Sequence, residues 1–283
     1  MNGTLKPRVP KSGTSARRPR LALEETRRRV LDCAVDRVFA ERGGTGLEHV
    51  RLEDAVRAAD VSRTAAYRCW PQREDFLADV LSALAEQALP IASTRSARAT
   101  GVVRAAVGDD PATVRTVEGR RAALLRAVSA SADDDLLADR EEDRRWRLYL
   151  TLAMAVPSLA DGPPRDRVVA AVNRAEQTVR TRLAANYRRL FELFGFTSTL
   201  GYEELAEIGL ALMRGYVVGG HAGADAGRPG PAYSLLAAGA AAPSDTGEWD
   251  EARGRRLLDE LAAPDVFGAG TPAVTGEHVG GGE

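Results

Sequence analysis

Residues 51–76 read RLEDAVRAADVSRTAAYRCWPQREDF, and this stretch decides the fold that the sequence predicts. The apolar residues in its first part recur at i, i+3, i+4 and i+7, and they are Leu52, Ala55, Val56 and Ala59. This spacing predicts a short helix with one buried face. The next residues, Asp60, Val61 and Ser62, interrupt the pattern, because Asp tolerates a left-handed turn and Ser is a good helix N-cap. A second short helix is therefore expected to begin after Ser62.

The second helix has two unlike faces. Ala66, Cys69 and Trp70 share the face that is expected to point inward. The opposite face is basic, hydroxylated and aromatic, and it consists of Arg63, Thr64, Tyr67 and Arg68. Two short helices joined by a three-residue turn, the second with such a face, are typical of a helix-turn-helix whose second helix enters the DNA major groove. A helical hairpin with an ordinary solvated face is the alternative.

The chemistry of these side chains suggests a DNA contact for each. Arg63 is expected to donate to guanine, Thr64 to meet a thymine methyl group or a base edge, and Tyr67 to give its hydroxyl to a phosphate. Arg73 follows Pro71 at the start of the next helix, where the helix macrodipole disfavours a cation unless an anion lies nearby. A DNA phosphate would supply that anion.

Residues 61–76, with the upstream helix RRRVLDCAVDRVFAERG at 27–43, resemble the DNA-binding domain of the TetR (tetracycline-repressor-like) family of transcriptional regulators. The residues that match the family pattern are Val61, Ser62, Tyr67, Trp70, Pro71, Arg73 and Glu74. The sequence departs from that pattern at Arg51, Asp60, Cys69 and Gln72. The predicted DNA contacts are Arg51, Ser62, Arg63, Thr64, Ala65, Tyr67, Arg68 and Arg73.

The resemblance covers about a quarter of the chain, and it implies a function for the whole. It implies a homodimer that binds a palindromic operator in double-stranded DNA, and a repressor that is released when a small-molecule effector enters the helical body. The dimer interface is expected at the two late helices, 164–194 and 203–220, with an intrachain helix pair as the alternative. A helical small-molecule-binding or scaffold protein that has lost specific DNA binding is the alternative function, because of the departures at Arg51, Asp60 and Gln72.

Charge is unevenly spread along the chain, although the formal net charge is −1. Residues 1–76 hold 16 basic and 11 acidic residues, whereas the remainder holds 23 and 29. A basic front end on an acidic body fits a DNA-reading module attached to a domain that does not bind DNA. Residues 1–20 contain six Lys or Arg and no acid, which predicts a disordered basic arm that follows phosphates or enters a minor groove. A solvated leader is the alternative.

Composition predicts an all-α fold, because Ala, Leu, Arg and Glu are abundant and only 5% of residues are aromatic. A three-helix helix-turn-helix domain is expected to be followed by a larger helical domain for ligand binding and dimerisation. Residues 132–135 are expected to form an irregular joint in that larger domain. The predicted segments are the arm at 1–20, the DNA-binding domain at 21–89, the helical domain at 90–223, and a Gly/Ala/Pro-rich extension at 224–283 with one short helix, 249–262.

An effector pocket in the helical domain would be largely apolar with few polar groups. The candidate lining residues are therefore its aromatic and Met side chains, and ordinary core packing is the alternative for each. They are Trp146, Tyr149, Met154, Tyr187 and Met213.

Catalytic and metal-binding patterns are missing from the sequence. The histidines His49, His221 and His278 are far apart, and there is no phosphate-binding loop or nucleophile elbow. We therefore expect no metal, no cofactor and no enzymatic activity. Cys33 and Cys69 fall on inward helix faces, which fits a reducing cytoplasm. No stretch approaches about 18 uncharged apolar residues, so a cytoplasmic protein with no membrane partner is expected.

Overall fold

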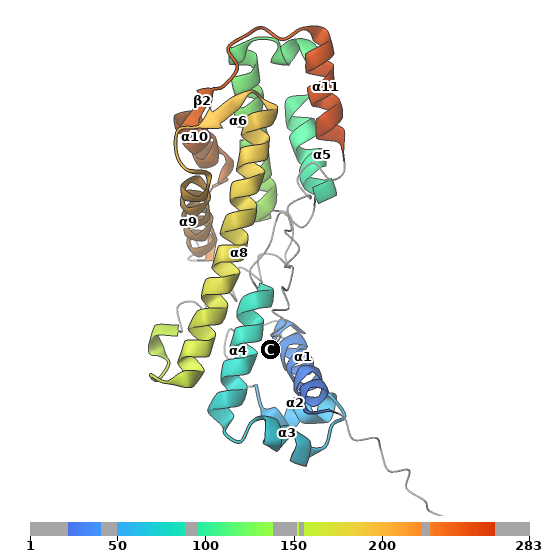
Figure 1. The fold of residues 1–283 in the computed structure, drawn as a ribbon, viewed down its shortest axis with the longest axis vertical. Helices are drawn as coiled ribbons and strands as arrows, with labels where there is room; N and C mark the ends of the chain where they lie inside the picture. The colour runs from blue at the N-terminus through green and yellow to red at the C-terminus, as the bar shows by residue number, and fades with distance from the viewer. Residues whose placement is uncertain are drawn as a thin grey trace, which may run out of the picture. The chain divides into compact units, whose positions relative to one another are not determined.

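The computed structural model describes residues 22–40, 50–88, 96–137, 152, 156–221 and 227–263. This part of the chain is mostly helical, and its one sheet has two strands (Figure 1). The prediction of an all-α protein is confirmed at the level of fold class. Contacts divide the chain into two units after Phe76, which lies inside α4 (Arg73–Ala88) rather than at the predicted boundary of residue 89.

The N-terminal unit is built from α1 (Leu23–Ala40), α2 (Leu52–Ala58), α3 (Arg63–Cys69) and the first residues of α4. Its core gathers buried side chains from every helix, and these include Val30, Ala34, Val35, Leu52, Val56, Ala66, Trp70 and Phe76. The rings of Trp70 and Phe76 meet edge to face, with their centroids 5.4 Å apart. This aromatic pair fixes the end of α3 against the start of α4.

The second unit is a helical array around α6 (Val117–Leu137), which packs against α5 (Ser96–Val107) and α10 (Gly230–Ala240). The longest helix, α8 (Pro163–Leu193), packs against α9 (Tyr202–His221) (Figure 1). Short pieces complete this unit, and they are η3 (Pro111–Val114), η4 (Val156–Ser158), β1 (Phe196–Ser198), β2 (Ala241–Pro243) and α11 (Glu251–Ala262). The strands β1 and β2 pair antiparallel, with Thr197 opposite Ala242.

Two expectations for the second unit are wrong. The predicted joint at residues 132–135 lies inside α6, because Ala132 is buried and Asp133 accepts the backbone N–H of Gly230 at 2.8 Å. Residues 227–263, the described part of the region after residue 223, contain two helices rather than one. The Gly/Ala-rich residues 230–240 form α10 because their small side chains allow close packing: a Cβ on Gly230 would lie 2.4 Å from the Ser129 Oγ on α6.

A buried arginine ties the C-terminal segment to α6. Arg120 is fully buried, and its guanidinium donates to the backbone carbonyls of Arg115 at 3.0 Å and Asp245 at 2.7 Å. The same group stacks on the ring of Trp249, 4.3 Å from its centroid. Burial lowers the pKa of Arg120 from its usual range, but an arginine remains charged at neutral pH. The loop before α11 is therefore anchored to the core through the Asp245 carbonyl and the buried Trp249.

Candidate nucleic-acid interface

The turn between α2 and α3 depends on one residue in the left-handed region. Asp60 has φ 51°, and it is the only described residue other than glycine with positive φ. Asp visits this region more readily than most residues, because its short side chain bonds the local backbone. Asp60 thus closes the turn between α2 and α3 in the left-handed conformation, so the departure from the TetR-like pattern at this position does not disrupt the turn.

Ser62 is the N-cap of α3, as the sequence predicts. Its side-chain oxygen accepts the backbone N–H of Ala65 at 3.1 Å, while the Ser62 backbone is extended. This bond leaves the Ser62 hydroxyl proton available to an outside acceptor. The Ala65 N–H is already bonded, so a DNA contact by Ala65 would have to use its methyl group.

The faces of α3 lie as the spacing predicts. Ala66 is fully buried, and Cys69 is half-buried with its thiol directed to the Leu23 carbonyl at 3.7 Å. The outward residues are exposed, and they are Arg63, Thr64, Tyr67 and Arg68. The apolar face of this seven-residue helix packs inward, and its opposite face presents polar and aromatic side chains to solvent.

The exposed arginines of the N-terminal unit fall into two groups. Within the described residues, four of the predicted DNA-binding side chains make no hydrogen bond or ion pair: Arg51, Arg63, Arg68 and Arg73. Other arginines of the unit are held by carboxylates. Arg28 pairs with Glu25 at 2.8 Å, and Arg57 pairs with Asp54 at 3.6 Å. The guanidinium groups around α3 are thus available to an external anion or base.

The described part of the N-terminal unit has no net positive charge that would mark it as a DNA-binding module. Residues 22–40 and 50–76 together hold nine basic and nine acidic residues. The positive excess expected for a DNA-binding module therefore belongs to residues 1–20, which lie outside the described residues. Any attraction of the folded unit to DNA would have to come from the local arrangement of its charges and not from its total charge.

Tyr67 has a partner that the sequence did not indicate. Its hydroxyl donates to the Glu53 carboxylate, with Oη and Oε1 2.9 Å apart, although the ring is 48% exposed. The neighbouring carboxylate raises the pKa of Tyr67. The predicted donation from Tyr67 to a phosphate therefore requires this bond to break first. Sequence reasoning missed Glu53 because the contact joins two helices across the turn and follows no helical period.

The predicted effector residues are only partly within the described structure. Trp146, Tyr149 and Met154 lie outside the residues that it describes, whereas Tyr187 on α8 and Met213 on α9 are buried. The Tyr187 hydroxyl lies so close to Gly209 that a Cβ there would be 2.7 Å from it. The sequence analysis missed Tyr233 on α10, which is buried and donates to the Gly209 carbonyl.

Both buried phenols stay protonated. Burial raises the pKa of Tyr187 and of Tyr233, and the charge of Asp135 contributes to each shift. The structure therefore gathers two neutral hydroxyl groups, a glycine backbone and apolar side chains between α8, α9 and α10. Such a mixture suits either a packed core or the wall of a site for a small molecule.

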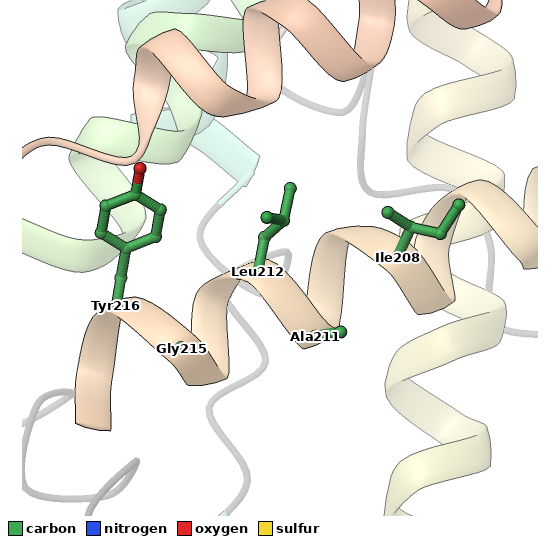
Figure 2. A pocket seen from close by; sticks show the side chains of 5 residues that line it. All are labelled: Ile208, Ala211, Leu212, Gly215 and Tyr216. Atoms are coloured by element: carbon green, nitrogen blue, oxygen red, sulfur yellow. The ribbon is translucent and has the colours of Figure 1, made fainter. Parts of the chain in front are cut away.

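An apolar groove of about 480 Å³ runs along α9, and Figure 2 shows its five lining residues. Ile208, Leu212 and Tyr216 point to the same side of the helix, and all three are half-buried. The spacing of the lining residues is one helical stripe, and they are Ile208, Ala211, Leu212, Gly215 and Tyr216. Exposed apolar surface of this kind often marks an interaction site.

Other chemistry finds little support in the part of the chain that is described. No three His, Cys, Asp or Glu side chains there are grouped so that they could hold a metal ion. The described helices include none with the length and apolar character needed to cross a membrane. Comparisons of the chain with protein-family models, with curated proteins and with solved structures found no match. The case for a function therefore depends on the residues themselves.

Proposed function

We propose that this protein is a DNA-binding transcriptional regulator of the TetR type, a homodimer whose α2 and α3 form a helix-turn-helix. One observation carries the proposal: Arg63 and Arg68 extend from the exposed face of a capped helix, and their side chains make no hydrogen bond or ion pair with the described residues. Guanidinium groups recognise guanine O6 and N7 bidentately and bind phosphates well. An α-helix in the major groove presents just such side chains to base edges.

Dimerisation is proposed through the stripe on α9. One short helix makes few base contacts, so specific binding at physiological salt usually needs two half-sites, and a two-fold dimer reads a palindrome. A two-fold interface brings the same patch of both copies together, and we propose the apolar stripe along α9 as that patch. Removal of this stripe from water would contribute to the association free energy.

Effector control is proposed to act through α4 and α8. Within the second unit, Arg167 of α8 pairs with the buried carboxylate of Asp79 on α4 at 3.6 Å, and Arg174 pairs with Glu86 at 2.8 Å. A small molecule seated near Tyr187 on α8 would bias these pairs if it shifted that helix. Repression relieved by an effector is the form that the TetR-like residues suggest for this control.

A helical small-molecule-binding or scaffold protein without specific DNA binding is the second candidate. The observation that favours it is the balance of nine basic and nine acidic residues in the described N-terminal unit. A protein of that kind would leave the arginines around α3 simply solvated.

The deciding experiment is selection of genomic DNA fragments by the purified full chain at near-physiological salt. The test variant is Arg63→Ala/Arg68→Ala, and the matched control is Arg28→Ala/Arg57→Ala, which removes the same charge from arginines that are already paired. The proposal expects a palindromic site to be enriched by the wild type and the control but not by the test variant. Equal enrichment by all three proteins would refute the assignment of α3 as the reading helix.

Dimerisation has its own test in sedimentation analysis. Leu212→Glu places a charge in the α9 groove and is expected to give monomers. Leu235→Glu is the control, because Leu235 on α10 is 75% exposed and does not line the groove. A dimer that survives Leu212→Glu would exclude this stripe as the interface.

A further inference from the structure

The hydrogen bond from Tyr67 brings an acidic side chain onto the proposed DNA-reading surface. Tyr67 lies on the exposed face of α3, and its hydroxyl reaches Glu53 on α2 at 2.9 Å. The carboxylate of Glu53 is therefore within one hydrogen bond of that face. Arg63 and Arg51 are its charged neighbours, since both act electrostatically on it.

Glu53 is ionised and oriented. Its own backbone N–H and then the Tyr67 hydroxyl hold the pKa of Glu53 below its usual range. An ionised carboxylate only accepts hydrogen bonds, and the Tyr67 proton occupies one of its oxygens. Glu53 is exposed, so its remaining acceptor sites are open to solvent. Glu53 thus brings a fixed acceptor to a face where the arginines bring donors.

DNA offers few partners to such a group. Phosphates carry only acceptors and repel a carboxylate, and the same holds for guanine O6 and N7 and for thymine O4. In the major groove the donors are the N4 amino group of cytosine and the N6 amino group of adenine. Adenine also presents its N7 acceptor beside that amino group, whereas cytosine presents no acceptor there. A carboxylate therefore fits cytosine best.

We infer that Glu53 is a specificity-determining residue, whose carboxylate accepts a hydrogen bond from the N4 amino group of a cytosine in each half-site. Arg63 beside it supplies donors for a guanine, so the two side chains together match the acceptors and the donor of G·C pairs. Tyr67 acts as a positioning residue, because its hydroxyl holds the carboxylate in place. This inference rests on the proposed DNA-binding function, and it changes the role of Tyr67 from a phosphate contact to a support for Glu53.

The test is selection from a library of randomised duplexes, followed by affinity measurement on the selected site. Wild type is expected to prefer cytosine over thymine at one position per half-site by about tenfold or more, as one good base contact provides. Glu53→Gln removes the charge with little change of shape, and it should shift that position alone towards adenine, which Gln binds bidentately. Tyr67→Phe should weaken the preference for cytosine without changing its identity.

Glu24→Gln is the matched control, since it removes one acidic charge from an exposed position on α1 in the same unit. It is expected to leave every base preference unchanged. If wild type and Glu53→Gln select the same site with the same preferences, the inference is overturned while the DNA-binding function stands. Tighter binding of Glu53→Gln to all sequences, with no change in preference, would also overturn it. If wild type selects no sequence, the proposed function falls and this inference falls with it.

Discussion

Replacement of Arg120 by Met is expected to reduce the free energy of unfolding by about 3 kcal/mol. Met is similar in length and apolar, so it fills most of the space but donates no hydrogen bonds. The Asp245 carbonyl then loses the only hydrogen bond that the structure gives it, whereas the Arg115 carbonyl keeps the Trp249 backbone N–H at 2.9 Å. Asp245 is half-buried, so its carbonyl without a partner costs about 2 kcal/mol, within the range of about 1–3 kcal/mol for a buried group. Removal of the cation–π interaction with Trp249 adds about 1 kcal/mol.

The opposing effect is relief of a buried charge, which costs several kcal/mol in the wild type. The two charge-assisted hydrogen bonds that are lost with the guanidinium, each worth about 1.5–3 kcal/mol, offset this relief. The net destabilisation therefore stays near the value of one carbonyl without a partner and one missing cation–π interaction. Urea unfolding at a fixed protein concentration measures the net destabilisation, because the stability of the proposed dimer would depend on concentration. Arg126→Met is the control: Arg126 is exposed on the same helix and makes one bond, to the Ala106 carbonyl at 3.0 Å. A difference between the two variants of less than about 1 kcal/mol would refute the reasoning.

Three further predictions follow from the N-terminal residues. Ser62→Ala should destabilise α3 by about 1 kcal/mol through removal of its cap, seen as faster amide hydrogen exchange in α3 than in α1. Because the pKa of Glu53 is lowered on folding, its contribution to stability is present above its unfolded pKa and is lost as pH falls through the lower folded value. The stability difference between wild type and Glu53→Gln should therefore shrink on acidification below about pH 4.5 and stay constant from pH 6 to 8. In a plot of log DNA affinity against log salt concentration, deletion of residues 1–20 should make the slope less steep by about 0.9 for each phosphate that the arm neutralises. An unchanged slope would show that the arm does not contact phosphates.

Elements with a strong period were predictable from the sequence. The apolar stripe of residues 52–59 and the Ser62 cap indicated α2, the turn and α3. Apolar residues spaced three and four apart along 164–194 indicated α8 to within one residue at each end. These signals come from residues close together in the sequence, so they indicate a helix whichever segment packs against it.

Contacts between distant segments could not be predicted in this way. Residues 230–240 look like a low-complexity run, and they are helical because glycine and alanine allow close packing on α6. The bond between Glu53 and Tyr67 is equally hidden, because it depends on the angle between two helices. One usable signal was overlooked: Tyr233 and Trp249 are large aromatic residues in a region otherwise poor in them, and both are buried.

The distance along the chain between α6 and its partners has a consequence for synthesis. Arg120 contacts Asp245 and Trp249, and Asp133 contacts Gly230. In each contact the second residue is translated about one hundred residues or more after the first. The core residues described above for the N-terminal unit lie between Val30 and Phe76, so this core can form while the ribosome is still making α5. The second unit holds an incomplete core until α11 has emerged, and its exposed apolar surface is then a target for chaperones and for aggregation. Early termination before residue 241 should therefore yield an insoluble product rather than a soluble, shortened protein.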